Sequence, residues 1–200
     1  MGPEMKTLLR VDASARIEGS HSRMLADFFQ HCWQEANPEG RVIHRDLALN
    51  PVPHLSGEEI IAFKDKAENS KAALSNKLCA EVLKTDHILI DSPLYNLSLP
   101  STLKAWLDHI ARPGLTFDVV SGKYVGLLND TNATVVTTRD SIYKPTICDD
   151  FQSDYLKAFF SMLGISNIHL VKVDGTSLRP EDRENIFLKA KNEIVYALQD

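Results

Sequence analysis

Three serines and a histidine precede the first amphipathic stretch of the chain. Ser14, Ser20, His21 and Ser22 lie at or just before the start of the stretch 22–36, which has the apolar spacing of a helix. Hydroxyls beside the free amides of a helix start can donate hydrogen bonds to phosphate oxygens. Capping of the helix needs only one of these hydroxyls, so the cluster favours a phosphate site, and simple capping is the alternative.

Charge near this loop narrows the chemistry further. Arg16 or Arg23 could add a positive charge to a phosphate site. The lysine of a Walker A loop is absent, which disfavours NTP hydrolysis. The seven histidines show no HxH or HExxH spacing and no ligand cluster, so we expect no metal site.

A second group of candidate residues lies near the middle of the chain. The segment 92–100 reads Ser-Pro-Leu-Tyr-Asn-Leu-Ser-Leu-Pro and follows a short apolar run. Apolar contact, an aromatic ring and the amide of Asn96 suit a flat heteroaromatic ligand. The alternative is that Leu94 and Tyr95 only cover the core. A phosphate at one end of a crevice and a planar ring at the other correspond to the shape of FMN.

Alternating apolar runs and amphipathic stretches would position these residues. The predicted strands are 7–11, 41–46, 87–90, 134–138 and 168–173. The predicted helices are 22–36, part of 57–84 (most clearly 72–83), 100–110, 151–163 and 180–198, with 112–126 taken as a loop. Strands that alternate with helices predict a parallel sheet covered on both faces.

The predicted fold class is α/β, a flavodoxin-like doubly wound five-stranded parallel sheet of order 2-1-3-4-5 with helices on both faces. We expect residues 1–200 to form a single domain. A Rossmann dinucleotide fold is disfavoured because no GxGxxG follows the first strand. Ligands of such sheets bind outside the carboxyl ends where strand order reverses. The loops at that point are 12–22 and 91–99, with 138–144 beside them.

Composition excludes several classes of protein. The 200 residues are 44% hydrophobic and 24% charged, with a net charge of -5, which opposes a broad nucleic-acid surface. No apolar run approaches the ~18 residues of a membrane span, and the polar opening is unlike a signal peptide. Scattered cysteines at 32, 79 and 148 fit a reducing compartment. We expect a cytoplasmic protein, with Met5 as a candidate natural start and residues 1–4 as an added remnant.

Several long segments together resemble one known family. They are 92–108, 112–117, 45–53 and 155–165, with the serines of 14–22. In these segments the chain resembles the FMN-dependent NADH-azoreductases, also described as FMN-dependent NADH:quinone oxidoreductases. The resemblance covers nearly the whole chain.

The resemblance implies a homodimer with two FMN sites near its interface. It implies a ping-pong cycle in which NADH, or alternatively NADPH, reduces FMN and a quinone or azo compound then takes the electrons. The flavin carries the hydride chemistry, so no catalytic side chain is expected. The residues implied to hold FMN are Ser14, Ser20, His21, Ser22, Pro93, Leu94, Tyr95, Asn96, Leu97, Thr138, Arg139, Asp140 and Ser141.

The chain departs from the family pattern at a few positions. The family usually has Gln in place of His21 and Gly-Gly in place of Asp140-Ser141, where glycines let the backbone approach the flavin. Phe117, with Val119 and Met162 at positions where aromatics are common, would line the substrate pocket. Two alternatives to the enzyme remain: a non-catalytic flavodoxin-like carrier or binding module, and a protein whose altered loop has weakened FMN binding.

Overall fold

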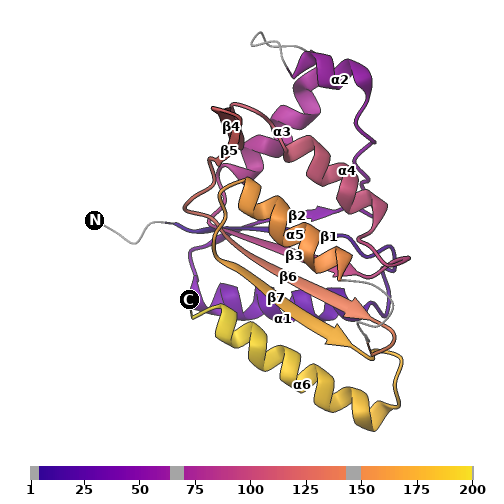
Figure 1. Ribbon diagram of the computed structural model, residues 1–200. Coiled ribbons are helices and arrows are strands. Elements are labelled where there is room, and N and C mark those ends of the chain that lie inside the picture. Colours follow the sequence, from indigo (N-terminus) through magenta and orange to yellow (C-terminus); the bar gives the residue numbers. More distant parts are fainter. Residues whose placement is uncertain (1–4, 64–69, 143–149, 200) are drawn as a thin grey trace.

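The computed structural model describes residues 5–63, 70–142 and 150–199 (Figure 1). Five strands form one parallel sheet of order β2-β1-β3-β6-β7, which confirms the predicted order of the five main strands. The strands are β1 (Thr7–Asp12), β2 (Arg41–Asp46), β3 (His87–Pro93), β6 (Asn132–Arg139) and β7 (Ile168–Asp174). Cys148, the end of the 138–144 loop and residues 1–4 lie outside the described residues.

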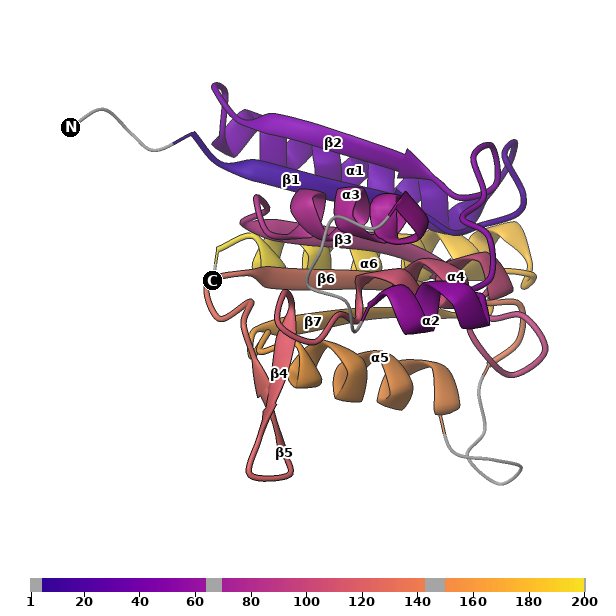
Figure 2. The same ribbon diagram turned by 90° about the horizontal axis from the view of Figure 1, so that it is seen from above.

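Helices cover both faces of this sheet, as predicted. Figure 2 shows α1 and α6 on one face and α3, α4 and α5 on the other. The helices are α1 (His21–Ala36), α2 (Gly57–Ala62), α3 (Ala73–Val82), α4 (Ser101–Ile110), α5 (Phe151–Met162) and α6 (Pro180–Ala197), with a 3-10 turn η1 (Ser70–Ala72) before α3. Among the described residues, no helix is both long enough and apolar enough to cross a membrane.

The core forms two apolar layers because successive strand residues point to opposite faces. Leu8 and Leu89 pack with α1 and α6, whereas Leu9, Ile88 and Ile90 pack with α3, α4 and α5. The inner strands are buried on both faces, which explains why they read as continuous apolar runs rather than as alternating ones. This burial fixes where each inner strand ends, and therefore where the loops of interest begin.

Helix α1 begins at the serine cluster and packs firmly. Ser20 is its N-cap and accepts a hydrogen bond from the backbone N–H of Arg23 at 3.4 Å. Leu25, Phe29 and Trp33 are buried at four-residue spacing. The helix start is therefore held rigidly against the sheet, with its first amides at the carboxyl edge.

The segment 112–126 contains a β-hairpin, so its prediction as a loop was wrong. Strands β4 (Phe117–Val120) and β5 (Lys123–Gly126) pair antiparallel across a two-residue turn. Ser121 and Gly122 both have positive φ, 52° and 75°, the geometry that two-residue hairpins prefer. The missed signal is a Ser-Gly pair between short β-branched segments.

Close glycine packing fixes the base of this hairpin. A Cβ atom on Gly126 would lie 2.0 Å from the backbone nitrogen of Gly164, just beyond α5. Leu128 N–H also donates to the Leu163 carbonyl at 2.9 Å. Only glycine permits this approach, so the sequence at Gly126 and Gly164 sets how the hairpin meets the helix layer.

Candidate functional site

The two loops singled out in the sequence lie side by side at one edge of the sheet. Asp12 is the last residue of β1, and Asp91 lies near the end of β3. The two residues are partners in the register of these strands. The backbone N–H of Ala15 donates to Tyr95 Oη at 3.2 Å. Residues about eighty positions apart in the chain therefore meet where the strand order reverses, the usual ligand position in open α/β sheets.

The serine cluster forms a chain of hydroxyl contacts at the start of α1. Ser20 Oγ donates to Ser14 Oγ at 2.9 Å and lies 3.2 Å from Ser22 Oγ. Ser20 is also the helix cap, so the capping alternative holds for that residue. It leaves Ser14 and Ser22 to be explained, and both are buried. The amides of His21 and Ser22, in the first turn of α1, have no intrahelical partner, and amides in this position are the kind that bind anions in other proteins.

His21 contributes a neutral ring and one of these amides. It is the first residue of α1, and its ring centroid lies 5.1 Å from that of Phe187. Burial lowers the pKa of His21, and the charges of Arg183 and Arg16 lower it further, whereas Asp140 opposes them. The ring is therefore mostly uncharged at neutral pH, so His21 adds little positive charge to the site.

A buried carboxylate lies directly beneath the serine loop. Asp91 has no exposed surface. Its carboxylate accepts hydrogen bonds from Ser22 Oγ at 2.8 Å, from the backbone N–H of Ser14 at 3.2 Å and from that of Ala13. Burial raises the pKa of Asp91 to about 6, the charge of Asp12 acts in the same direction, and the three hydrogen bonds oppose both.

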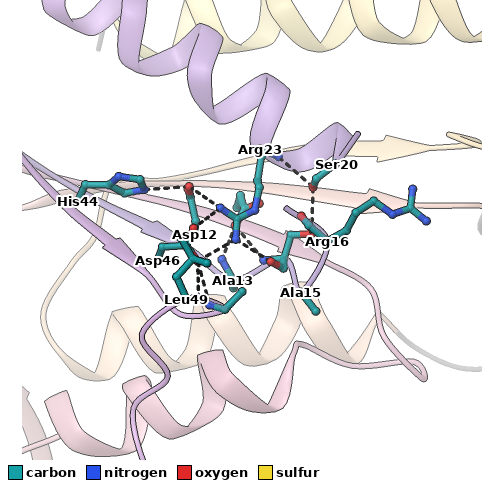
Figure 3. A network of polar contacts seen from close by, with 12 residues as sticks. Asp12, Ala13, Ala15, Arg16, Ser20, Arg23, His44, Asp46 and Leu49 are labelled. Atoms are coloured by element: carbon teal, nitrogen blue, oxygen red, sulfur yellow. Dashed lines mark hydrogen bonds and ion pairs between the residues drawn. The ribbon is translucent and has the colours of Figure 1, made fainter. Parts of the chain in front are cut away.

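Arg23 supports the loop from below and is committed to internal partners (Figure 3). Its Nη1 lies 3.1 Å from Asp12 Oδ2 and 2.5 Å from Asp46 Oδ2. Its Nη2 donates to the Ser14 carbonyl at 2.8 Å. The expectation that Arg23 adds charge to a ligand gives way to a supporting role, because its guanidinium is already shared by two carboxylates. Arg16 is exposed, and Figure 3 shows its side chain directed away from this network.

The second loop contains a tight turn with strained backbone. Tyr95 N–H donates to the Ser98 carbonyl at 2.9 Å, and Ser98 N–H donates back at 3.0 Å. The central residues Asn96 and Leu97 have φ of 49° and 66°. Leucine rarely adopts this left-handed conformation, and such strain is concentrated at binding and catalytic sites. Tyr95, Asn96 and Leu97 are exposed, so this turn offers side chains and amides to a ligand.

Pro93 and Leu94, at the base of that turn, are fixed from two directions. Leu94 N–H donates to the Thr138 carbonyl of β6 at 2.9 Å. Gln152, buried at the start of α5, donates from Nε2 to the carbonyls of Ser92 and Pro93 at 3.0 and 3.1 Å. Pro93 and Leu94 are half-buried, so they form a firm floor beside the crevice rather than part of the deep core.

In the third loop, residues 138–142, the arginine is directed into the protein and the aspartate is exposed. Arg139 is buried and forms an ion pair with Asp150, the N-cap of α5. Asp140 is exposed, and its Oδ1 accepts from Thr176 Oγ1 at 3.3 Å. The guanidinium of Arg139, which the resemblance implied would help to hold FMN, is therefore directed at the start of a helix. Of the other predicted residues here, Thr138 is buried and Ser141 is exposed.

The predicted substrate-pocket residues lie at the other end of the sheet within one chain. Phe117 starts the hairpin, Val119 is exposed on it, and Met162 ends α5. Helix α5 begins near the ligand edge and spans roughly 18 Å at 1.5 Å per residue. Figure 2 shows the hairpin beside the far end of α5. One chain by itself does not bring these three residues to the loops around Ser14 and Tyr95.

A hollow of about 410 Å³ lies beside the strained turn, between α4 and α5. Its lining is mainly apolar, and the sequence analysis did not identify it. The i, i+4 pair of aromatics at the start of α5 was the available signal, because such residues share one helix face. The lining residues are Ser98, Leu99, Lys104, Phe151 and Tyr155.

Comparison with known proteins is consistent with this geometry. A family described as having a flavodoxin-like fold matches residues 5–197. This chain belongs to the flavodoxin-like family. Among curated members, an FMN-dependent NADH:quinone oxidoreductase of Cellvibrio japonicus is 38% identical over 196 residues, covering 95% of this chain and 97% of that protein. One of the same name from Hydrogenovibrio crunogenus is 40% identical over 179 residues, covering 86% and 89%.

Solved structures of other proteins share the fold. An azoreductase from Bacillus anthracis Sterne has a TM-score of 0.88 at 24% identity, covering 98% of this chain and all of that one. An FMN-dependent NADH-azoreductase from Bacillus anthracis Ames Ancestor, solved in complex with FMN, has a TM-score of 0.82 at 21% identity, covering 96% and 99%. The flavodoxin-like architecture thus extends over the whole described chain.

Sequence reasoning missed three members of this flavodoxin-like site. They are Asp91, Gln152 and Arg23 in its supporting role. Their partners are distant in the sequence: Asp91 and Ser14 are 77 positions apart, Gln152 and Ser92 are 60 apart, and Arg23 and Ser14 are 9 apart. The one available signal was an aspartate ending an otherwise apolar strand. Among the described residues, no group of three or more His, Cys, Asp or Glu side chains is arranged to hold a metal.

Proposed function

We propose that this protein is an FMN-dependent NADH:quinone oxidoreductase that also reduces azo compounds, by two-electron transfer. Two relatives of that name, matched over 97% and 89% of their own length, support the proposal. The observation that carries it is the contact of Ala15 with Tyr95, which joins a hydroxyl-rich helix start to an exposed aromatic turn. FMN, when bound, supplies the hydride-transfer chemistry.

The residues present fit the phosphate of FMN. Ser14 and Ser20 supply hydroxyls, and the amides of His21 and Ser22 start α1. A helix start of this kind stabilises an anion through its N–H groups and dipole. These residues bind the phosphate and set the register of the cofactor along the sheet edge.

The second loop fits the flat ring system. Pro93 and Leu94 form an apolar floor held by Thr138 and Gln152, so the floor cannot retreat from the ring. The strained turn presents Asn96 and backbone N–H groups toward polar ring edges. A rigid site lowers the cost of ordering the ligand and sets its orientation.

The apolar hollow between α4 and α5 suits an incoming flat substrate. Tyr155 and Phe151 offer aromatic surface there, and Leu99 closes the side nearest the turn. A nicotinamide, a quinone or an azo-linked ring shares this planar apolar character. The role of these side chains is to place that ring and exclude water. Donor and acceptor would use the space in turn, as a ping-pong cycle requires.

We also propose a homodimer. Phe117, Val119 and Met162 lie away from the ligand edge of their own chain, so a second copy is needed to bring them to a flavin. The hairpin exposes Val119, Val120, Tyr124 and Val125, an apolar surface that a partner could cover.

Cys32 and Cys79 are free thiols, which supports a reducing, cytoplasmic location.

The test is spectroscopic and then kinetic. The purified protein is loaded with FMN and its visible spectrum recorded, and NADH is added without oxygen. The enzyme should lose its flavin absorbance rapidly, and then recover it when a quinone such as menadione or an azo dye is added. A protein that cannot be reconstituted with FMN overturns the proposal. A flavin that NADH leaves oxidised identifies the carrier alternative instead.

A further inference from the structure

We propose that Asp91 couples FMN binding to proton uptake, because its buried carboxylate occupies the donors that the phosphate needs and must be neutralised when the phosphate binds. This inference rests on the proposed FMN site and adds a residue that determines its affinity. Asp91 lies beneath the loop and has no exposed surface. When ionised, the Asp91 carboxylate is therefore a negative charge of the protein next to the place where the negatively charged phosphate of FMN is proposed to bind.

The first argument is that Asp91 and the phosphate compete for the same hydrogen-bond donor, the hydroxyl of Ser22. Ser22 has a single hydroxyl proton, and at present Ser22 Oγ donates it to Asp91 Oδ2 at 2.8 Å. Ser20 donates its own proton to Ser14, and Ser14 donates to the Arg16 carbonyl at 3.2 Å. A protonated Asp91 reverses the first bond and donates to Ser22 Oγ. The Ser22 proton is then released toward the phosphate.

The second argument is charge. Asp12, on β1, repels an ionised Asp91, and Arg23, on α1, attracts it. Arg23 is already divided between Asp12 and Asp46, so its compensation of Asp91 is partial. On the β6 side, the register partner of Asp91 is the apolar Val136. An ionised Asp91 therefore leaves excess negative charge below the site.

The groups around Asp12 do not remove this excess. Arg10 Nε lies 2.8 Å from Asp12 Oδ1, and His44 Nε2 lies 2.9 Å from Asp12 Oδ2. Arg10 also pairs with Asp27 at 2.7 Å, so its charge is shared as well. Arg16 is exposed on the loop. A phosphate that carries about two negative charges at pH 7 would add repulsion to this edge.

The direction of the pH effect follows from linkage. Without ligand, burial sets the pKa of Asp91 at about 6, so the carboxylate is largely ionised at neutral pH. A bound phosphate raises that pKa further, because like charges disfavour ionisation. Binding above about pH 6 therefore takes up a proton, and FMN affinity falls as pH rises, by at most about tenfold per pH unit. Protonation of the phosphate itself, with a pKa of about 6, has the opposite sign and acts mainly below that pH.

The experiment titrates the apoprotein with FMN by flavin fluorescence from about pH 6.5 to pH 8, with riboflavin as the ligand that lacks a phosphate. Isothermal calorimetry near pH 7.5, in buffers of different ionisation enthalpy, counts the protons taken up. We expect FMN binding to weaken about five- to tenfold across this range, with uptake of up to about one proton. Riboflavin binding should not change with pH.

Two variants assign the proton. Asp91→Asn keeps the shape and hydrogen-bonding capacity of the side chain without the charge, so FMN should bind tighter than wild type at about pH 8, with little proton uptake. Ser22→Ala keeps the carboxylate and removes the shared hydroxyl, so binding should weaken while the pH dependence persists.

Two results would contradict the inference. Wild-type protein that binds FMN without proton uptake overturns it, and that measurement needs no variant to fold. An Asp91→Asn protein that binds FMN with the wild-type pH slope also overturns it. Failure of wild type and Asp91→Asn to bind FMN at any pH would instead refute the proposed function itself, so the two failures are distinguishable.

Discussion

At the scale of single residues, two carboxylates at the same edge of the sheet have opposite pKa shifts. The hydrogen bond from Arg23 lowers the pKa of Asp46 to about 2, whereas burial raises the pKa of Asp91 to about 6. The difference is the cation: Arg23 forms a bidentate pair with Asp46 and only partly compensates Asp91. The site therefore combines a fixed negative charge with one that changes near neutral pH.

Asp91 should make the apoprotein less stable as pH rises. Its pKa is above the value of about 3.9 in an unfolded chain, so ionisation between about pH 4 and pH 7 favours unfolding, by up to about 3 kcal/mol. Asp91→Asn removes this loss. Urea denaturation of both proteins should show a variant that gains stability relative to wild type from the lower to the higher pH. An equal difference at the two pH values would contradict the raised pKa.

Arg23 should be far more important for stability than Arg16. Arg23→Met removes the cation that pairs with the half-buried Asp46 and leaves the buried Asp12 with Arg10 as its remaining arginine. It also removes a donor from the Ser14 carbonyl. Breaking a buried pair costs about 3–5 kcal/mol. Arg16→Met, on the exposed loop, should change the free energy of unfolding by no more than about 0.5 kcal/mol. Chemical denaturation near pH 7 compares them, and equal effects would refute the supporting role of Arg23.

At the scale of elements, the turn at 95–98 is strained where a ligand is expected. Leu97 has a φ of 66°, a conformation that is unfavourable for leucine. Because its side chain is 54% exposed, burial of apolar surface does not offset this cost. Leu97→Gly should raise the free energy of unfolding by about 0.5–1 kcal/mol and weaken FMN binding, because the side chain beside the ring is lost.

A matched substitution separates strain from loss of a side chain. Leu83 is 47% exposed but has the ordinary helical φ of -65° at the end of α3. Leu83→Gly should lower stability, since glycine costs conformational entropy and relieves no strain there. Thermal unfolding measures both variants. A Leu97→Gly protein destabilised as much as Leu83→Gly would show that the turn stores no strain.

At the scale of the whole molecule, the hairpin and the proposed ligand site lie at opposite ends of the sheet in one chain. Tyr124 and Val125 are 66% and 43% exposed and lie on the two faces of the hairpin. In the proposed homodimer, Tyr124→Glu with Val125→Glu should yield monomers by analytical ultracentrifugation, because burying two carboxylates opposes association. Their NADH:quinone activity should fall with the loss of the shared pocket.

The control lies on a remote helix. Tyr196 is 63% exposed, similar to Tyr124. It belongs to α6, which covers the opposite face of the sheet from α5 (Figure 2). Tyr196→Glu should leave the sedimentation of wild type unchanged. A wild-type protein that sediments as a monomer at micromolar concentration would refute the homodimer.

The sequence by itself determined the parallel sheet, its order and its loops of interest. Apolar runs and helical stripes are local patterns set by burial, and strand alternation with helices restricts the topology to few choices. Ser14, Ser20 and Ser22 could be placed at a helix start for the same reason. The hairpin at 117–126 was not predicted, because its short and mostly exposed strands lack a pattern of buried residues.

Only the tertiary structure decided what the charged residues do. Arg23 and Arg139 were expected near a ligand, and both are paired with carboxylates, some of them distant in sequence. Asp91 was identified in the sequence only as the first residue of the loop 91–99, without a role, and it lies beneath the site. The physical reason is that the energy of a charge depends on its burial and its neighbours, which long-range packing supplies and local sequence patterns do not encode.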